Sequence, residues 1–147
     1  MAISATEYET LRAWSAKFIE RVLPLPAGLP PESHPIVVLD GMALEAPARA
    51  RQGLGMMIGD FIEDTSHLPA SQVKQIDAEF STAGLPTLSD MRLRFMRQIK
   101  RIVKRGSISK EEEYYLIRNA VEGVADDEQP QLWQMLADYE VRSVSKM

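Results

Sequence analysis

The side chains best suited to metal binding or acid–base chemistry gather in one short stretch. Asp60, Glu63, Asp64 and His67 are spaced so that they would share a face of a continuous helix. A di-iron carboxylate site requires a Glu-x-x-His pattern on each of two helices, and this chain has one imperfect copy, Asp64-x-x-His67. Pro69 indicates that the helix has already ended near His67. The pattern therefore predicts no metal site, and it favours a histidine stabilised by the negative end of a helix dipole.

Other catalytic arrangements have no better support. The chain has no cysteine, which removes thiolate nucleophiles, thiolate metal ligands and disulfides. His34 stands in a proline-rich segment, and the G-x-S-x-G pattern of a nucleophilic serine is absent. The acidic run 111–113 is typical of a first helical turn. We expect no catalytic, cofactor-binding or metal-binding residue and favour a non-enzymatic protein; a small enzyme would require a deep pocket that joins residues distant in the sequence.

Three glycines, Gly53, Gly55 and Gly59, lie within one apolar-patterned stretch. A phosphate-binding loop would need a following Lys-Ser/Thr pair, which is missing. Each glycine costs about 1 kcal/mol relative to alanine inside a helix, so a compensating contact is expected. Because Gly55 and Gly59 are four residues apart, they predict close packing of another backbone on that face, with self-association as the alternative.

The most distinctive pattern is a basic face on the helix predicted at 88–105. At 100° per residue, its apolar side chains fall within about 60° of one direction. Six basic side chains fall between about 120° and 260°. Seven of the 17 basic residues of the chain lie at positions 92–105, and no acidic residue follows Asp90 there. The candidate residues for binding an anionic partner are Arg94, Arg97, Lys100, Arg101, Lys104 and Arg105.

Three interpretations of the basic face stay open. The side chains could be solvated and pair with nearby acids such as Glu111, Glu112 and Glu113. They could bind an acidic surface of another protein or subunit, or nucleic acid phosphates. A membrane surface is disfavoured, since the apolar face is needed for the core. Within the second interpretation we favour a protein, because the net charge of −4 is negative and no aromatic residue interleaves with the cations.

The elements that position these residues are predicted to be helices. Ser4 and Glu7 have the spacing of a capping box, and an apolar stripe follows, so a helix is expected at 5–23. Five prolines between residues 24 and 35 predict a linker or extended segment at 24–46, with 36–39 as a candidate strand or short helical turn. Further capping boxes are expected at Thr87 and Ser109. Helices are expected at about 47–64, 69–84, 88–105 and 110–123, and after 128.

These patterns predict one all-α domain over 1–147, a compact bundle of about six helices with a helical core at 47–147. The N-terminal helix joins it through the proline-rich segment and packs on the same chain or on another subunit. No secretory signal or membrane-length apolar run is present, which favours the cytoplasm. We expect a protein-interaction module that self-associates or binds another protein, with a nucleic-acid-associated protein as the alternative.

Overall fold

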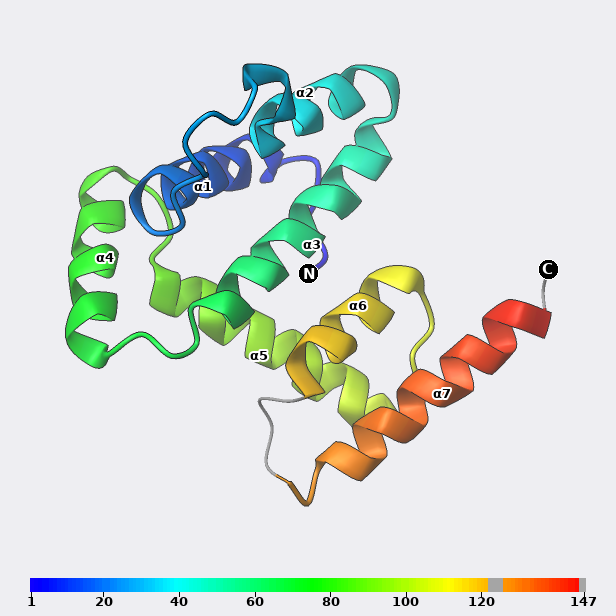
Figure 1. Ribbon diagram of the computed structural model, residues 1–147. Helices are drawn as coiled ribbons and strands as arrows, with labels where there is room; N and C mark the ends of the chain where they lie inside the picture. Colours follow the sequence, from blue (N-terminus) through cyan, green and yellow to red (C-terminus); the bar gives the residue numbers. More distant parts are fainter. Residues whose placement is uncertain (122–125, 146–147) are drawn as a thin grey trace.

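The computed structural model describes residues 1–121 and 126–145 and confirms the all-α class. Within these residues it has seven α-helices, one short 3₁₀ helix and no strand (Figure 1). The elements are α1 (Tyr8–Arg21), η1 (Pro31–Ser33), α2 (Pro35–Glu45), α3 (Pro47–Asp64), α4 (Ala70–Thr82), α5 (Leu88–Arg105), α6 (Glu111–Ala120) and α7 (Gln129–Ser145). None of the described helices is long and apolar enough to cross a bilayer.

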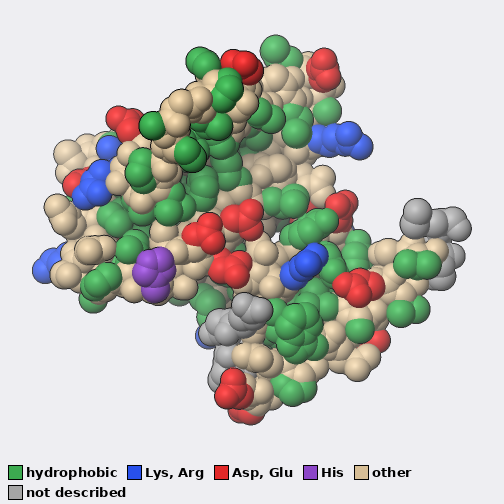
Figure 2. Space-filling view, in the orientation of Figure 1, with side chains coloured by type: hydrophobic (Ala, Val, Ile, Leu, Met, Phe, Trp, Pro, Cys, Tyr) green, Lys and Arg blue, Asp and Glu red, His purple; other side chains and the backbone are tan. Residues whose placement is uncertain are grey.

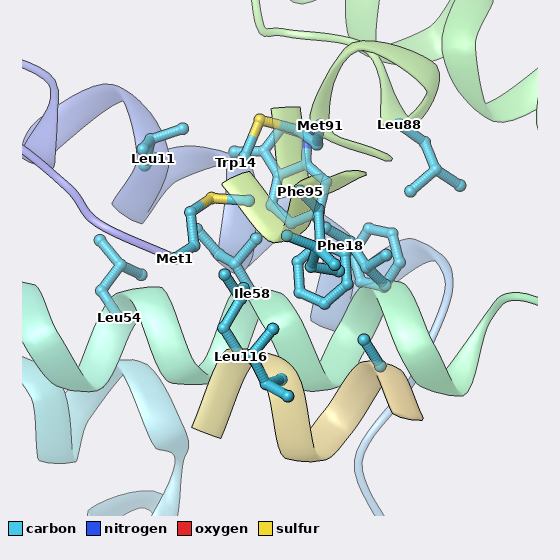
Figure 3. Close-up of a cluster of buried hydrophobic side chains, with 14 of the residues drawn as sticks. Met1, Leu11, Trp14, Phe18, Leu54, Ile58, Leu88, Met91, Phe95 and Leu116 are labelled. Carbon is cyan, nitrogen blue, oxygen red and sulfur yellow. The ribbon is translucent and has the colours of Figure 1, made fainter. Parts of the chain in front are cut away.

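The N-terminal helix packs on its own chain. Helix α1 contacts α2 and α3, and its apolar stripe buries Trp14 and Phe18 completely. The two rings stack with centroids 4.7 Å apart, and Phe80 from α4 meets both edge-on. Figure 3 shows Trp14 and Phe18 in the same cluster as Ile58 from α3. The core therefore includes α1 together with α3 and α4, rather than beginning after the proline-rich segment.

The prediction of a linker over 24–46 is wrong for its second half, because residues 35–45 form helix α2. His34 is the N-cap, where its Nδ1 accepts a hydrogen bond from the backbone N–H of Ile36 at 3.1 Å. Pro35 occupies the first helical position, where its fixed φ suits the helix and its missing N–H costs nothing. Ile36 and Leu39 are buried. Tertiary packing has thus overridden the strand preference of the β-branched residues.

The predicted capping boxes have three different outcomes. At Thr87 the box is complete: its hydroxyl accepts from the N–H of Asp90, whose carboxylate accepts from the N–H of Thr87. At Ser4 only the carboxylate half is present, because Glu7 accepts the Ser4 N–H. At Ser109 the prediction that Glu112 closes the box is wrong. Glu113 instead accepts both the N–H and the hydroxyl of Ser109, because α6 begins one residue later.

The glycines of α3 do make room for close packing. A Cβ on Gly55 would stand 1.9 Å from the carbonyl oxygen of Met1, which packs directly over this helix and is 3% exposed. A Cβ on Gly59 would stand 3.4 Å from the Phe95 ring of α5. Both glycines therefore serve contacts within the chain.

The remaining helix bounds follow the predictions closely. Helix α5 has the predicted limits, and it ends at Gly106, whose φ of 84° is left-handed. Gly84, predicted to end the preceding helix, has φ 74°. The prediction of a helix over 110–123 is met at 111–120, and its last residues, with Val124, lie outside the described part of the chain.

Candidate interaction surface

Helix α5 separates apolar and basic side chains as the sequence predicts. Leu88, Met91, Phe95, Ile99 and Ile102 are all buried, and they point toward α3, α4 and α6. Figure 3 shows Met91 and Phe95 entering the central cluster. Since five apolar anchors fix the rotation of the helix, the basic side chains on the other side are held in one direction.

Two of the six candidate cations are paired inside the chain. Arg94 donates to both carboxylate oxygens of Glu7, at 2.9 and 2.7 Å, and to the carbonyl of Ala2. Arg105 donates to both oxygens of Glu113 and to the carbonyl of Ser107. The Arg105–Glu113 pair agrees with the interpretation that assigned partners among residues 111–113, whereas Arg94 pairs with Glu7, which that interpretation did not name; both are intramolecular pairs. They hold the N-terminal segment and α6 against α5.

The pKa values of both carboxyl groups reflect this pairing. Hydrogen bonding from Arg94 holds the pKa of Glu7 below its ordinary value. Burial raises the pKa of Glu113, but hydrogen bonds from Arg105 and Ser109 outweigh burial, so its pKa is also lowered. Both carboxylates are therefore ionised near neutral pH.

The other four candidate cations are exposed. Arg97, Lys100, Arg101 and Lys104 make no ion pair and no side-chain hydrogen bond within the described residues. Lys104 also stands in the last turn, where the helix dipole favours a cation. Arg101 borders a small cavity of about 110 Å³ that Glu112 also lines, without an ion pair between the two.

Two large apolar side chains are exposed among these cations. Leu93 is 50% exposed and Met96 is 45% exposed. At 100° per residue Leu93 points between Lys100 and Lys104, and Met96 points about 40° from Lys100, toward the apolar side of the helix. The α5 outer face, as we name it, consists of Leu93, Met96, Arg97, Lys100, Arg101 and Lys104. The charge pattern alone did not predict Leu93 and Met96 as part of the surface, although their helical angles place both outside the buried side of the helix.

An open groove lies beside this face, toward α4. Its volume is about 420 Å³, and it is lined by Leu68, Ala70, Val73, Lys74, Asp77, Ser89 and Arg92. Ser89 and Arg92 lie one turn before Leu93 and Met96, so the groove lies next to the N-terminal end of the α5 outer face. Ser89 donates to Asp77, and Arg92 donates to the Thr65 carbonyl, so the polar walls of the groove are fixed.

A second helix also exposes an apolar stripe. Helix α7 buries Leu132, Met135 and Leu136, while Trp133, Val141 and Val144 are 51%, 69% and 70% exposed. The exposed residues recur at steps of three and four along one side of the helix. We name this side the α7 outer stripe; it consists of Pro130, Trp133, Ala137, Val141 and Val144. Figure 1 shows α7 at the edge of the molecule, beside α6.

Helix α2 carries the third exposed apolar surface. Val37, Val38, Met42 and Leu44 are all exposed, and Leu44 is 89% exposed. The only charged side chains of this helix are Asp40, which is bound by Arg12 at 2.6 and 2.5 Å, and Glu45 at its end. This surface has no charged character comparable to that of the α5 outer face.

The stretch that suggested acid–base chemistry does not assemble into a site. His67 is exposed in the turn after α3, and no group of three or more histidine or carboxylate side chains in the described residues could hold a metal ion. Asp60 accepts a hydrogen bond from Asn119 at 2.7 Å, and burial raises its pKa. Figure 2 shows acidic side chains gathered over α3 on an open face. His34, the other histidine, caps α2.

Comparisons with known proteins supply no function for this chain. No protein-family model matches its sequence, no curated protein is detectably similar to it, and no solved structure matches its fold.

Proposed function

We propose that this protein is a non-enzymatic interaction module whose α5 outer face binds an acidic, partly apolar surface of a protein. The supporting observation is that Arg97, Lys100, Arg101 and Lys104 are exposed beside Leu93 and Met96, with no carboxylate of the described chain paired to any of the four.

The charge on this face is unbalanced. Four like charges within three turns repel one another, and an acidic partner relieves that repulsion. Arg94 and Arg105, which belong to the same basic pattern, already have carboxylate partners. The two paired arginines stand at either end of this pattern, and the four cations between them have no ion-pair partner among the described residues. Unpaired cations between neutralised ones are the arrangement expected of a site that binds an acidic surface.

The apolar residues favour a protein over nucleic acid. Protein interfaces combine an apolar centre with a polar rim, and methionine and arginine are enriched in them. Phosphate contacts make no use of Leu93 and Met96, and no aromatic side chain stands on this face to stack on bases. The adjacent groove toward α4 suits an amphipathic helix, which binds through residues spaced three and four apart.

A labelled amphipathic peptide of leucine and glutamate, about five turns long, tests this proposal. We expect it to bind the protein, and we expect Lys100→Glu combined with Lys104→Glu to weaken binding about tenfold or more, since like charges would then face each other. Arg49→Glu combined with Arg118→Glu is the matched control, because it makes the same change in net charge at exposed positions on α3 and α6.

Duplex DNA is the competing probe. If the protein contacts phosphates through the four unpaired cations, log affinity falls with log salt with a slope of roughly −3.6. DNA binding with that slope, lost in the Lys100→Glu/Lys104→Glu variant, would replace the proposal with a nucleic-acid function. Binding of neither probe at low salt would overturn both.

A further inference from the structure

We infer that the partner of the α5 outer face is the α7 outer stripe of a second copy of this chain, so that two copies dock reciprocally through α5 and α7. The inference rests on the proposed function, because it names the partner of the same surface. The geometry that carries it is the presence of two unpartnered helical faces in one chain, one cationic with two apolar residues and one apolar with acidic residues before and beside it.

The α7 outer stripe has the chemistry that the α5 outer face requires. Its apolar residues are exposed along most of the helix, with Trp133 as the large aromatic anchor that interfaces favour. Acidic side chains lead into it and flank it. Asp126, Asp127, Glu128 and Asp138 are exposed and make no ion pair within the described part of the chain.

The order of the residues along the two helices matches when they run antiparallel. On α5 the apolar residues come first and most of the cations follow, whereas on α7 the acids come first and the valines follow. At 1.5 Å per residue, Leu93 to Lys104 spans roughly 16 Å and Gln129 to Val144 spans roughly 22 Å, so α7 is long enough to cover the α5 outer face. Antiparallel docking therefore brings Val141 and Val144 to Leu93 and Met96, and the acidic end of α7 to the cationic end of α5.

The contact cannot form within one chain. Helix α7 is fixed on α6 by Leu132, Met135 and Leu136, and Tyr114 of α6 stacks on Tyr139 with centroids 5.3 Å apart. At 100° per residue these contacts occupy the side of α7 roughly opposite the outer stripe, whose large side chains are exposed. In a two-fold dimer each α7 meets the partner's α5, and the contact occurs twice. Because the contact occurs twice, the dimer buries twice the surface area of a single helix pair, which brings it closer to the area that stable interfaces bury.

A charge-swap experiment tests this pairing. The first variant carries Lys100→Glu and Lys104→Glu, and the second carries Asp127→Lys and Asp138→Lys. Sedimentation velocity is expected to show dimers for the wild type and monomers for each variant alone. Mixing the two variants restores complementary charge at both contacts, so we expect a dimer that contains one of each. The Arg49→Glu/Arg118→Glu control dimerises as the wild type does.

Tryptophan fluorescence gives an independent readout. The chain has two tryptophans, of which Trp14 is 0% exposed and Trp133 is 51% exposed. Iodide quenching is expected to fall as protein concentration rises, because docking covers Trp133 while Trp14 stays buried throughout. Trp133→Ala should remain folded, since the side chain is half exposed, and should prevent dimer formation.

Several outcomes overturn the inference. Dimers that survive both charge reversals and disappear with Trp133→Ala would mean that α7 pairs with α7. Dimers lost only with Leu44→Ser would place the interface on α2. A monomeric wild type, or variants that fail to associate when mixed, would reject self-docking. If the leucine–glutamate peptide still binds in that case, the proposed function stands and the self-docking inference alone fails.

Discussion

At the scale of single residues, the chain shows where a glycine is required by contact and where it is not. Gly55 lies against the Met1 carbonyl, whereas a Cβ on Gly41 of α2 would meet nothing within 4 Å. Both stand inside helices without positive φ. The sequence predicted close packing at Gly55, but spacing alone could not identify Met1, since the two residues meet only in the fold.

Substitution of these two glycines should therefore have opposite effects. Gly55→Ala must displace backbone, and we expect it to lower the free energy of unfolding by about 1–3 kcal/mol. Gly41→Ala relieves the entropic cost of glycine in a helix and should raise that free energy by up to about 1 kcal/mol. Urea titration measures both. Equal effects would show that Met1 does not pack over α3.

The pairing of Glu7 with Arg94 predicts an acid sensitivity. Because the folded state lowers the pKa of Glu7 below 4.5, the pair contributes its full stability above that pH. The contribution is lost as pH falls through the lower, folded pKa. We expect Glu7→Gln to destabilise the protein at pH 7 and to make stability fall less steeply between pH 5 and 3. Thermal melts across this range give the comparison.

Glu9→Gln is the control for this measurement, since Glu9 makes no ion pair within the described residues. Its pH profile should follow that of the wild type. A Glu7→Gln profile parallel to the wild type would contradict the predicted coupling.

At the scale of elements, α5 owes its position to its caps as well as to its apolar face. Thr87→Ala removes the side-chain acceptor for the Asp90 N–H. We expect this change to cost about 1 kcal/mol of unfolding free energy, measured in urea. Thr82→Ala, at an exposed position where the hydroxyl donates to the Ala78 carbonyl, should change stability by less than about 0.5 kcal/mol. A loss at Thr87 no larger than at Thr82 would show that the cap is dispensable.

The same comparison of elements explains which helices could be predicted. For α5 the N-terminal cap, the helical spacing of the apolar residues and the final glycine all predict the same helix from local sequence alone. For α2 the local signals conflict: prolines precede it, β-branched residues fill it and a glycine interrupts it. Its helical state depends on the cap at His34 and on packing against α3. Because the packing is a tertiary contact, local sequence signals could not predict it. The two candidate surfaces differ in the same way. The basic side of α5 was predicted from its charges, whereas the α7 outer stripe was not predicted.

At the scale of the whole molecule, α7 is a helix with little tertiary support. It packs mainly on α6 and exposes a full apolar side, whereas α3 contacts α1, α2, α5 and α6. We expect backbone amides near Val141 to exchange with solvent much faster than those of Leu54–Ile58, measured by hydrogen exchange at low protein concentration. If the self-docking inference is correct, raising the concentration slows exchange in α7 and leaves α3 unchanged. Equal protection of α3 and α7 in dilute protein would contradict this picture.

The ion pair between Glu7 and Arg94 joins residues 87 positions apart, and this separation has a consequence for biosynthesis. A ribosome adding about 5–20 residues per second delivers Arg94 roughly 4–17 s after Glu7. During that interval Trp14 and Phe18 have left the ribosome before Phe80 and α5 exist to cover them. The apolar face of α1 is thus only partly covered, and open to a ribosome-associated chaperone, until α4 and α5 have been synthesised.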